Sequence, residues 1–446
     1  MAELIVSVSG LRGIVGKTLT EDTAARYAAA FANHLQEGPV LVTRAGRATG
    51  PALAQAAFAA LHRSGRETID GQIAATPTTG VLVKHLNCAG AIQISASHNP
   101  AEYNGMKLFG PDGRVIPAAQ GLLVKQQFDD LVGSDFTSSA AVHPHQSIDS
   151  YDSHLELILN TVNVERIRAC RYPVLLDSNH GAGSLLGRKL LETLGCEVTV
   201  LGNKPDGQFE HPPEPTADNL VHVGQQVVDC GAVVGFCQDP DADRLALIDA
   251  DGRYLGEEYS LALCADHVLQ QRSGPIVTNC STSRMVKDIA TRHGAPFFHS
   301  AVGEANVCDE MIRRNAVFGG EGNGGPIDPR VGYVRDSFVG MAQVLDAMSH
   351  NQQPLSQWAD TLPRYFIKKT TIAVQPNQIG ELFDKLQLVF CVAESSRLDG
   401  LRLDWPDQWL LIRASNTEPI VRIVAEATSQ NTVDKLCELT SQVLQS

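Results

Sequence analysis

The chain repeats one order of segments three times: an apolar strand, a turn rich in glycine or polar residues, a helix and another strand. The copies run over residues 39–100, 172–252 and 274–325. Strands that alternate with helices in this way predict mostly parallel sheets with helices on both faces. We therefore expect an α/β chain with three similar α/β domains and mixed, mostly parallel sheets.

The C-terminal part has a different pattern. Three strand-like segments, IKKTTIAV, WLLIRAS and IVRIVAEA, precede the segment TVDKLCELTSQVL, which predicts a helix with one apolar face. This order indicates a C-terminal α+β domain. A length of 446 residues suits three or four domains at roughly 100–200 residues each. The expected domains cover residues 1–145, 146–255, 256–360 and 361–446.

Charge and composition narrow the class of partner. The net charge of -14 argues against nucleic acid or a membrane surface, because both are negatively charged. No apolar run approaches about 18 residues, and the first residues lack the basic and then apolar pattern of a signal peptide. The ten cysteines are scattered and form no C-x-x-C pair, which is typical of reduced thiols. We expect a cytoplasmic protein, monomeric or homodimeric, with a small-molecule partner.

The segment QDPDADR (238–244, the aspartate loop) places three acids at alternate positions, Asp239, Asp241 and Asp243. A locally extended chain aims all three carboxylates the same way, and hard oxygen ligands at this spacing suit Mg²⁺. An EF-hand is excluded, since its sixth position holds Arg244 instead of Gly and its twelfth holds Ala250 instead of Glu. An acidic turn is the ordinary alternative. The flanking strands AVVGF and LALI favour a ligand site at a sheet edge.

The segment RASNTEP (413–419, the C-terminal loop) has the residue types of a phosphate site. Arg413 offers a bidentate guanidinium, and Arg422 follows on the next strand. Short donors lie between them, at Ser415, Asn416 and Thr417. An ordinary turn rich in Ser and Asn is equally compatible with this stretch alone.

Two glycine-rich segments are further candidates. In GGEGNGG (319–325, the glycine loop), five glycines let the backbone approach a ligand, and Glu321 and Asn323 are the side chains able to bond hydroxyls. In SGLRGIVG (9–16), Arg12 is a cation between glycines. Taken alone, the first segment favours a structural turn, and Arg12 favours a solvated surface charge.

The segment ISASHNPAEYNGMK (94–107, the serine loop) combines small polar residues with Ser97, His98 and Lys107. A serine hydrolase is disfavoured, because adjacent residues on an extended chain point apart and no G-x-S-x-G is present. Ser95 is interpreted as a structural neighbour. Lys107 differs, since a lysine near phosphate can have its pKa tuned for proton transfer.

Together the loops SASHNP, DPDADR, GE-x-x-G and RASNTEP, in this order and one per domain, closely resemble the α-D-phosphohexomutase superfamily over nearly the whole chain. The resemblance implies that Ser97 is a phosphoserine that donates its phosphoryl group to a sugar phosphate. It implies one Mg²⁺ per chain, held by the three aspartates and an oxygen of that phosphoserine. It also implies a hexose 1,6-bisphosphate, as intermediate and activator. The four domains would be arranged around a central cleft, and the last of them would hinge.

The resemblance assigns further roles, residue by residue. Arg12 and Lys107 flank the transfer, with Lys107 as candidate acid or base; His98 and Asn99 support the serine loop, and Arg244 the aspartate loop. Glu321 and Asn323 bind sugar hydroxyls. The phosphate that does not react is held by Arg413, Ser415, Asn416 and Thr417, with Arg422 nearby.

Departures from the family pattern bear on the substrate. Many relatives have GE-x-SGH in the glycine loop, where this chain has Asn323 and Gly325, and Glu304 stands where some carry His. With STSR at 281–284, these variants look more like the phosphoglucosamine mutase branch typical of archaea. TRAGRATG lacks the usual Gly-Arg-Asp-Thr-Arg and leaves Arg44 and Arg47.

We therefore expect a phosphohexomutase that interconverts glucosamine 6-phosphate and glucosamine 1-phosphate, feeding UDP-N-acetylglucosamine synthesis. Phosphomannomutase or phosphoglucomutase activity is the alternative. A Mg²⁺-dependent sugar phosphatase and a silent phosphosugar-binding protein are weaker hypotheses.

Overall fold

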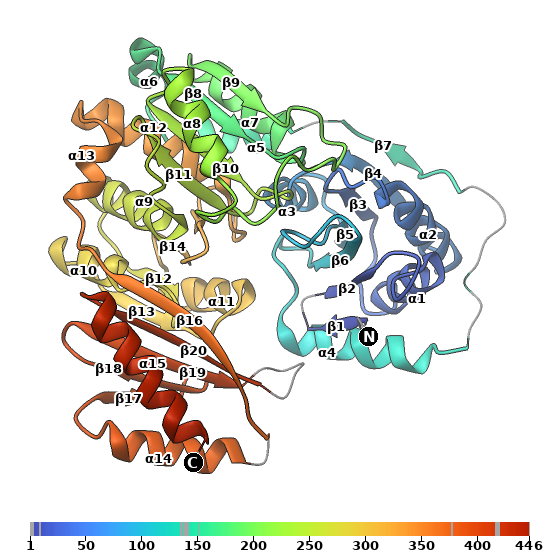
Figure 1. Cartoon of the computed structure of the whole chain (residues 1–446). Coiled ribbons are helices and arrows are strands. Elements are labelled where there is room, and N and C mark those ends of the chain that lie inside the picture. The colour runs from blue at the N-terminus through green and yellow to red at the C-terminus, as the bar shows by residue number, and fades with distance from the viewer. Residues whose placement is uncertain are drawn as a thin grey trace.

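The computed structural model describes residues 4–8, 10–133, 136, 142–149, 151–375, 378–414 and 420–445. Within these ranges the chain forms four sheets, one after another along the sequence (Figure 1). No helix in these ranges combines the length and the apolar character that a membrane crossing requires.

The first sheet has seven strands in the order β1-β2-β6-β5-β3-β4-β7. Strand β3 pairs in parallel with β4 and β5, while β1, β2 and β6 add antiparallel partners at one side. Helix α1 begins after Thr20, whose side chain accepts a hydrogen bond from the Thr23 backbone and caps the helix. The elements are β1 (Ile5–Ser7), β2 (Gly10–Ile14), α1 (Glu21–Ala32), β3 (Val40–Arg44), α2 (Gly50–Arg63), β4 (Thr68–Ile73), α3 (Thr76–His85), β5 (Gly90–Ile94), β6 (Tyr103–Phe109), α4 (Ala118–Asp130) and β7 (Gln146–Ser147).

The second sheet has the order β11-β10-β8-β9, with β8 parallel to both β9 and β10. Strands β10 and β11 form an antiparallel hairpin, so the aspartate loop lies at its tip. All ten residues of these two strands are buried, which fixes the base of that loop. The elements are α5 (Asp152–Leu159), α6 (Val164–Cys170), β8 (Pro173–Asp177), α7 (Gly183–Thr193), β9 (Glu197–Leu201), α8 (Val221–Asp229), β10 (Val234–Gln238) and β11 (Leu245–Asp249).

The third sheet has the order β13-β12-β14-β15, again mostly parallel. The glycine loop turns from β14 into β15, so it lies at the carboxyl end of a central strand. The elements are α9 (Glu257–Gln271), β12 (Ile276–Asn279), α10 (Met285–Arg292), β13 (Phe297–Ser300), α11 (Glu304–Arg314), β14 (Phe318–Glu321), β15 (Gly325–Ile327), α12 (Ser337–Asn351) and α13 (Leu355–Asp360).

The last sheet is entirely antiparallel, in the order β16-β20-β19-β18-β17. The predicted terminal helix is present as α15, which buries Val433, Leu436, Cys437 and Leu444. The elements are β16 (Phe366–Ala373), α14 (Ile379–Val389), β17 (Glu394–Ser396), β18 (Leu401–Asp404), β19 (Gln408–Ala414), β20 (Ile420–Ala427) and α15 (Gln430–Gln445). Three mixed, mostly parallel sheets and a C-terminal antiparallel sheet thus confirm the fold class expected from the sequence.

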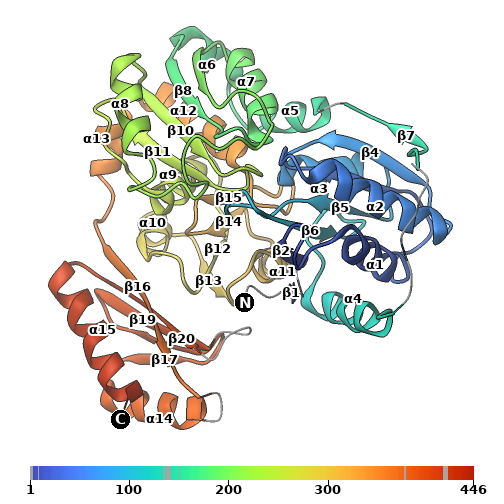
Figure 2. The ribbon, with the colours of Figure 1, turned by 45° about the vertical axis from the view of Figure 1, so that its right-hand side comes forward.

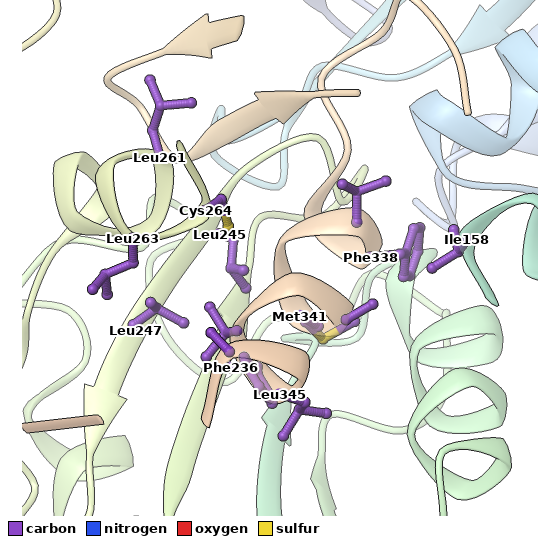
Figure 3. Packing of buried hydrophobic residues seen from close by; sticks show 14 of the residues in the cluster. Ile158, Phe236, Leu245, Leu247, Leu261, Leu263, Cys264, Phe338, Met341 and Leu345 are labelled. Atoms are coloured by element: carbon purple, nitrogen blue, oxygen red, sulfur yellow. The ribbon is translucent and has the colours of Figure 1, made fainter. Parts of the chain in front are cut away.

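The second and third sheets share one hydrophobic core. Phe236 of β10 packs in the same cluster as Leu261 of α9 and Met341 and Leu345 of α12 (Figure 3). The last sheet has a core of its own, and most of the core of the first sheet is separate too, although Ala45, Ala75 and Val81 belong to the shared core. Figure 2 shows the last sheet as a lobe at one end of the chain, reached through β16. Because that lobe has its own core, it can move without opening the core of its neighbours.

Candidate active site

The serine loop and the aspartate loop meet although they belong to different sheets. Ser97 Oγ donates a hydrogen bond to Asp239 Oδ2 at 2.8 Å, and both residues are buried. The guanidinium of Arg47 holds the serine loop in place. It donates at 2.6 to 2.9 Å to the carbonyl oxygens of Ser97, Asn99, Pro100 and Tyr103. One buried arginine therefore fixes the backbone that presents the Ser97 hydroxyl.

The three carboxylates of the aspartate loop converge. Asp239, Asp241 and Asp243 are each fully buried, and one oxygen from each lies within 4.8 Å of the others. The loop is not extended as we predicted. It forms one turn at 240–241 followed by a bend at 242–243, and Ala242 has a left-handed φ of 56°. The turn, and not strand alternation, brings the carboxylates to one point.

Asp239 is bonded at both oxygens, because Ser97 donates to Oδ2 and the backbone N–H groups of Asp243 and Arg244 donate to Oδ1 at 3.2 and 3.1 Å. Asp241 and Asp243 are bonded at one oxygen only. Asp241 Oδ2 accepts from Thr76 at 2.8 Å and from Ser95 at 3.0 Å, which places Ser95 in the supporting role expected of it. The Oδ1 atoms of Asp241 and Asp243 are buried and have no hydrogen-bond partner among the described residues. Burial, with the charges of Asp241 and Asp243, raises the pKa of Asp239 well above its ordinary value. Unpaired hard oxygens that repel one another are a donor set that fits Mg²⁺.

Two cations from other elements face the carboxylates. Lys107 Nζ lies 3.0 Å from Asp243 Oδ2, and Arg335 Nη2 lies 2.6 Å from the same oxygen. Burial alone would lower the pKa of Lys107, but Asp243 and Asp241 outweigh it and raise that pKa. Lys107 is therefore a cation at neutral pH.

His98 contacts Ser97, contrary to our expectation that the two side chains point apart. Ser97 has a left-handed φ of 48°, so the loop is not extended there and His98 Nδ1 lies 3.2 Å from Ser97 Oγ. Burial, with the charges of Arg244 and Arg12, lowers the pKa of His98 to about 3. A histidine with that pKa is a weak base, so the contact does not make a hydrolase pair.

Glu321 of the glycine loop is held by four groups. Its Oε1 accepts from Asn279 at 2.7 Å and from the Gly303 backbone at 3.0 Å. Its Oε2 lies 3.2 Å from Arg335 Nη1 and 3.5 Å from Asn323 Nδ2. The Oδ1 atom of Asn323 is buried without a partner among the described residues. Of the two side chains predicted to bind hydroxyls, Asn323 thus has the free acceptor.

One cleft of about 540 Å³ is lined by the side chains around Ser97 and Glu321, whereas Arg47 and the three aspartates are not part of its lining. Arg12, Ser97, His98 and Lys107 come from the first sheet and its loops, and Arg244 from the second. The backbone N–H of Arg244 donates to Asp239, as expected of a support, while its side chain pairs with Glu214 at 3.4 Å. The remaining charged and amide side chains of the lining come from the third sheet and from β16: Glu258, Asn279, Glu304, Asn306, Glu321, Asn323, Arg335 and Lys369.

The C-terminal arginines lie apart from this cleft. Arg413, near the end of β19, forms an ion pair with Asp399 at 2.8 Å, and Arg422 is exposed opposite it on β20. Ser415, Asn416 and Thr417 lie outside the described residues. Their predicted role at a distal phosphate stays a prediction.

Several residues of the site were not selected from the sequence: Thr76, Asn279 and Arg335. Asn279 ends β12, beside β14, so the rule that ligands bind at the carboxyl ends of parallel strands would have found it. Thr76 and Arg335 carry no comparable signal, because each reaches the aspartate loop only through packing between domains.

Comparison with known proteins agrees with this arrangement. Phosphoglucomutase/phosphomannomutase α/β/α domains I, II and III match residues 4–131, 152–252 and 257–366, and the C-terminal domain of the same enzymes matches residues 379–442. The chain belongs to the phosphoglucomutase/phosphomannomutase family. The family predicted from the four loops is confirmed.

Relatives of the family cover almost the whole chain. A phosphoglucomutase/phosphomannomutase of Thermococcus kodakarensis is 35% identical over 98% of this chain and 97% of its own length. A phosphoglucosamine/phosphogalactosamine mutase of Sulfurisphaera tokodaii is 30% identical over 97% of both chains. The crystal structure of a family protein from Burkholderia thailandensis superimposes with a TM-score of 0.86, at 26% identity, covering 99% of this chain and 97% of that one. The protein is a phosphohexomutase, an intramolecular phosphotransferase of carbohydrate metabolism.

Proposed function

We propose that the enzyme interconverts glucosamine 6-phosphate and glucosamine 1-phosphate through a phosphoserine at Ser97. The observation that carries the Ser97 assignment is its buried hydroxyl, 2.8 Å from one carboxylate of a converging triplet. Glu304 and Asn323, which depart from the common pattern, both line the cleft and support an amino sugar. The S. tokodaii relative, named for amino-sugar phosphates, agrees with this choice.

The transfer exchanges one P–O bond for another. The bond between phosphorus and Ser97 Oγ breaks, a bond from phosphorus to a sugar hydroxyl oxygen forms, and the proton of that hydroxyl ends on Ser97 Oγ. The resulting bisphosphate turns over, and its other phosphoryl group returns to Ser97. Such a transfer needs mainly positioning and charge neutralisation. Lys107, Arg335 and Arg12 supply fixed positive charge around the reacting group, and Arg47 fixes the backbone of Ser97.

Asp239, Asp241 and Asp243 would hold Mg²⁺, which supplies further charge neutralisation when bound. The buried, unpaired Oδ1 atoms of Asp241 and Asp243 support this assignment. Glu321 and Asn323 of the glycine loop would bind hydroxyls of the sugar ring. Arg413 and the 415–417 segment would hold the phosphate that does not react.

The phosphoserine is tested by intact mass together with substitution. We expect wild-type enzyme incubated with hexose 1,6-bisphosphate to gain the mass of one phosphate, and Ser97→Ala to gain none and lose activity. Ser95→Ala is the matched control, because that hydroxyl also bonds an aspartate of the triplet but is expected to carry no phosphate. Full activity in Ser97→Ala would contradict the assignment.

The substrate is tested by comparing kcat/KM for the 1-phosphates of glucosamine, glucose and mannose. Phosphoglucomutase/phosphomannomutase activity is the second candidate, because the 35% identical T. kodakarensis relative carries that name. A preference of about tenfold, or about 1.4 kcal/mol, for glucose or mannose 1-phosphate would replace our proposal with that one. Steady release of inorganic phosphate would instead indicate a phosphatase.

A further inference from the structure

Two carboxylates of the cleft are not used by the proposed reaction. Glu258 lies in the first turn of α9 and Glu304 begins α11, and both line the cleft. In each of them the Oε1 atom is buried and has no hydrogen-bond partner among the described residues. Glu321, which also lines the cleft, differs because both of its oxygens are bonded. The cleft therefore has two carboxylates with a free oxygen.

Glu304 lies at the reactive end of the cleft. Its Oε2 is 2.7 Å from Arg335 Nε, and Arg335 also contacts Asp243 of the aspartate loop. The electrostatic neighbours of Glu304 include Lys107, which flanks Ser97. The side chain is 8% exposed.

Glu258 lies toward the last domain. Its Oε2 accepts from the Ser283 backbone at 3.0 Å, and its electrostatic neighbours include Lys369 of β16 and Glu426 of β20. It also touches the glycine loop, since a Cβ added at Gly322 would lie 2.2 Å from its carboxylate oxygens. Glu258 thus touches the glycine loop directly, and Glu304 is connected to it through Arg335, which also contacts Glu321.

A buried carboxylate oxygen without a partner is unfavourable, and a cation is the partner that satisfies it best. An amino sugar phosphate brings such a cation, an ammonium group on C2. Because C2 is bonded to C1, the ammonium always lies at the C1 end of the ring. Turnover of the bisphosphate then moves the ammonium from one end of the cleft to the other.

We propose that Glu304 and Glu258 are a pair of specificity-determining residues that bind the C2 ammonium in the two orientations of the ring. Glucosamine 6-phosphate presents its C1 hydroxyl to Ser97, so its ammonium meets Glu304. Glucosamine 1-phosphate presents its C6 hydroxyl, so its ammonium meets Glu258. This inference rests on the proposed amino-sugar substrate.

The raised pKa of Glu258 is consistent with a carboxylate that lacks a cationic partner. Burial raises its pKa to about 8, although Lys369 and the Ser283 backbone oppose the shift. Lys369 forms no ion pair with it in the structure, although both side chains line the cleft. Pairing with Lys369 when the last domain moves is the rival explanation. This rival explanation predicts that loss of the Glu258 carboxylate changes the binding of every hexose phosphate equally.

Binding to the phosphorylated enzyme in EDTA tests the inference without turnover. There the phosphoserine keeps a second phosphate away from the reactive end, which fixes the orientation of the ligand. By calorimetry we expect Glu258→Gln to raise the Kd for glucosamine 1-phosphate about tenfold, the effect of one charged hydrogen bond. The Kd for glucosamine 6-phosphate changes much less. Glu304→Gln shows the reverse.

Glucose 1-phosphate and glucose 6-phosphate are the matched ligands, since they lack the ammonium. Glu257→Gln is the matched variant: it neighbours Glu258, but it pairs with Arg244 at 3.9 Å and does not line the cleft. An equal loss for glucose phosphates, or unchanged binding in both variants, overturns the inference. If wild-type enzyme binds glucosamine phosphates no more tightly than glucose phosphates, the proposed substrate itself is wrong.

Discussion

Arg335 connects three carboxylates that come from three elements. Its guanidinium lies 2.6 Å from Asp243, 2.7 Å from Glu304 and 3.2 Å from Glu321. Burial alone would lower its pKa, but these carboxylates raise it well above its ordinary value. The planar fork of an arginine can bond several acceptors at once, whereas a lysine is a single point of charge.

We therefore expect Arg335→Lys to be severely impaired. At least one buried carboxylate loses its partner, which typically costs about 3 kcal/mol or more of the free energy of unfolding. Because the positions of Asp243 and Glu321 also depend on this contact, we expect kcat/KM to fall about a hundredfold, or about 2.7 kcal/mol. Steady-state kinetics and thermal unfolding measure the two effects. Arg313→Lys, at an exposed position of α11, should change neither.

Single residues were predictable from the sequence where short-range chemistry defines them. The three aspartates lie within one short loop, so they were found together although that loop is not extended as predicted. Ser97 was selected because its loop resembles the phosphoserine loop of the family. The contact between His98 and Ser97 was missed, because a left-handed φ at a serine has no signature in the residue types. Glu258 and Arg335 were missed because their contacts depend on α9 and α12 packing beside distant loops.

Helix α12 shows how one side chain joins several elements. Asp346 accepts from His267 at 2.8 Å and Gln271 at 3.0 Å, both of α9, and from Arg166 of α6 at 2.7 Å. Burial would raise its pKa, but the hydrogen bonds from His267, the Asn163 backbone and Gln271 lower it to about 2.

A lowered pKa means that Asp346 stabilises the folded chain when ionised. Its contribution is fully present above the ordinary pKa of about 3.9 and is lost as the pH falls from about 4 to 2. The shift corresponds to about 2 kcal/mol. We expect Asp346→Asn to lower the free energy of unfolding at pH 7 and to lose most of this difference from wild type at pH 2. Urea unfolding across that range measures it, with the exposed Asp130→Asn of α4 as control. A difference that does not depend on pH would contradict the prediction.

The order of helices and strands followed from the sequence, but their partners did not. Alternation of apolar strands and helices predicted three α/β units and a different last part. Nothing in that pattern indicates that α12, which follows the third sheet, packs against β10 of the second. Such a contact is set by the shapes of whole domains, which local periodicity does not carry.

The proposed metal site joins the first and second domains, because Ser97 and the aspartate triplet face one another across their boundary. Bound Mg²⁺ should therefore stabilise the molecule as a whole. A ligand at about a hundred times its Kd adds about 2.7 kcal/mol. We expect Mg²⁺ to raise the midpoint of thermal unfolding by a few degrees and EDTA to reverse the rise. Asp241→Asn should lose most of this response, while Asp251→Asn, at an exposed turn, should keep it. An equal rise in both variants would show that Mg²⁺ acts elsewhere.

The last domain is joined to the third by a small set of contacts. The Arg402 guanidinium bonds the Cys280 carbonyl, Glu426 accepts from the Arg284 backbone at 3.0 Å, and Asp399 accepts from the Val302 backbone at 2.8 Å. Their shared apolar cluster has four buried residues: Cys280, Trp409, Leu411 and Val424. An interface made of a few polar contacts and one small apolar cluster is typical of domains that move relative to one another.

If Arg413 holds the distal phosphate, the last domain must close on the ligand, because Arg413 does not line the cleft in this structure. We expect hexose 1,6-bisphosphate to reduce the radius of gyration in X-ray scattering. Arg413→Ala should lose most of that reduction and weaken binding by about tenfold or more, the effect of a lost charged hydrogen bond. Lys435→Ala, on α15, is the control and should close like wild type. Closure that is complete in Arg413→Ala would show that other groups hold the distal phosphate, and an unchanged radius in wild type would show that the arrangement of domains seen here already admits the ligand.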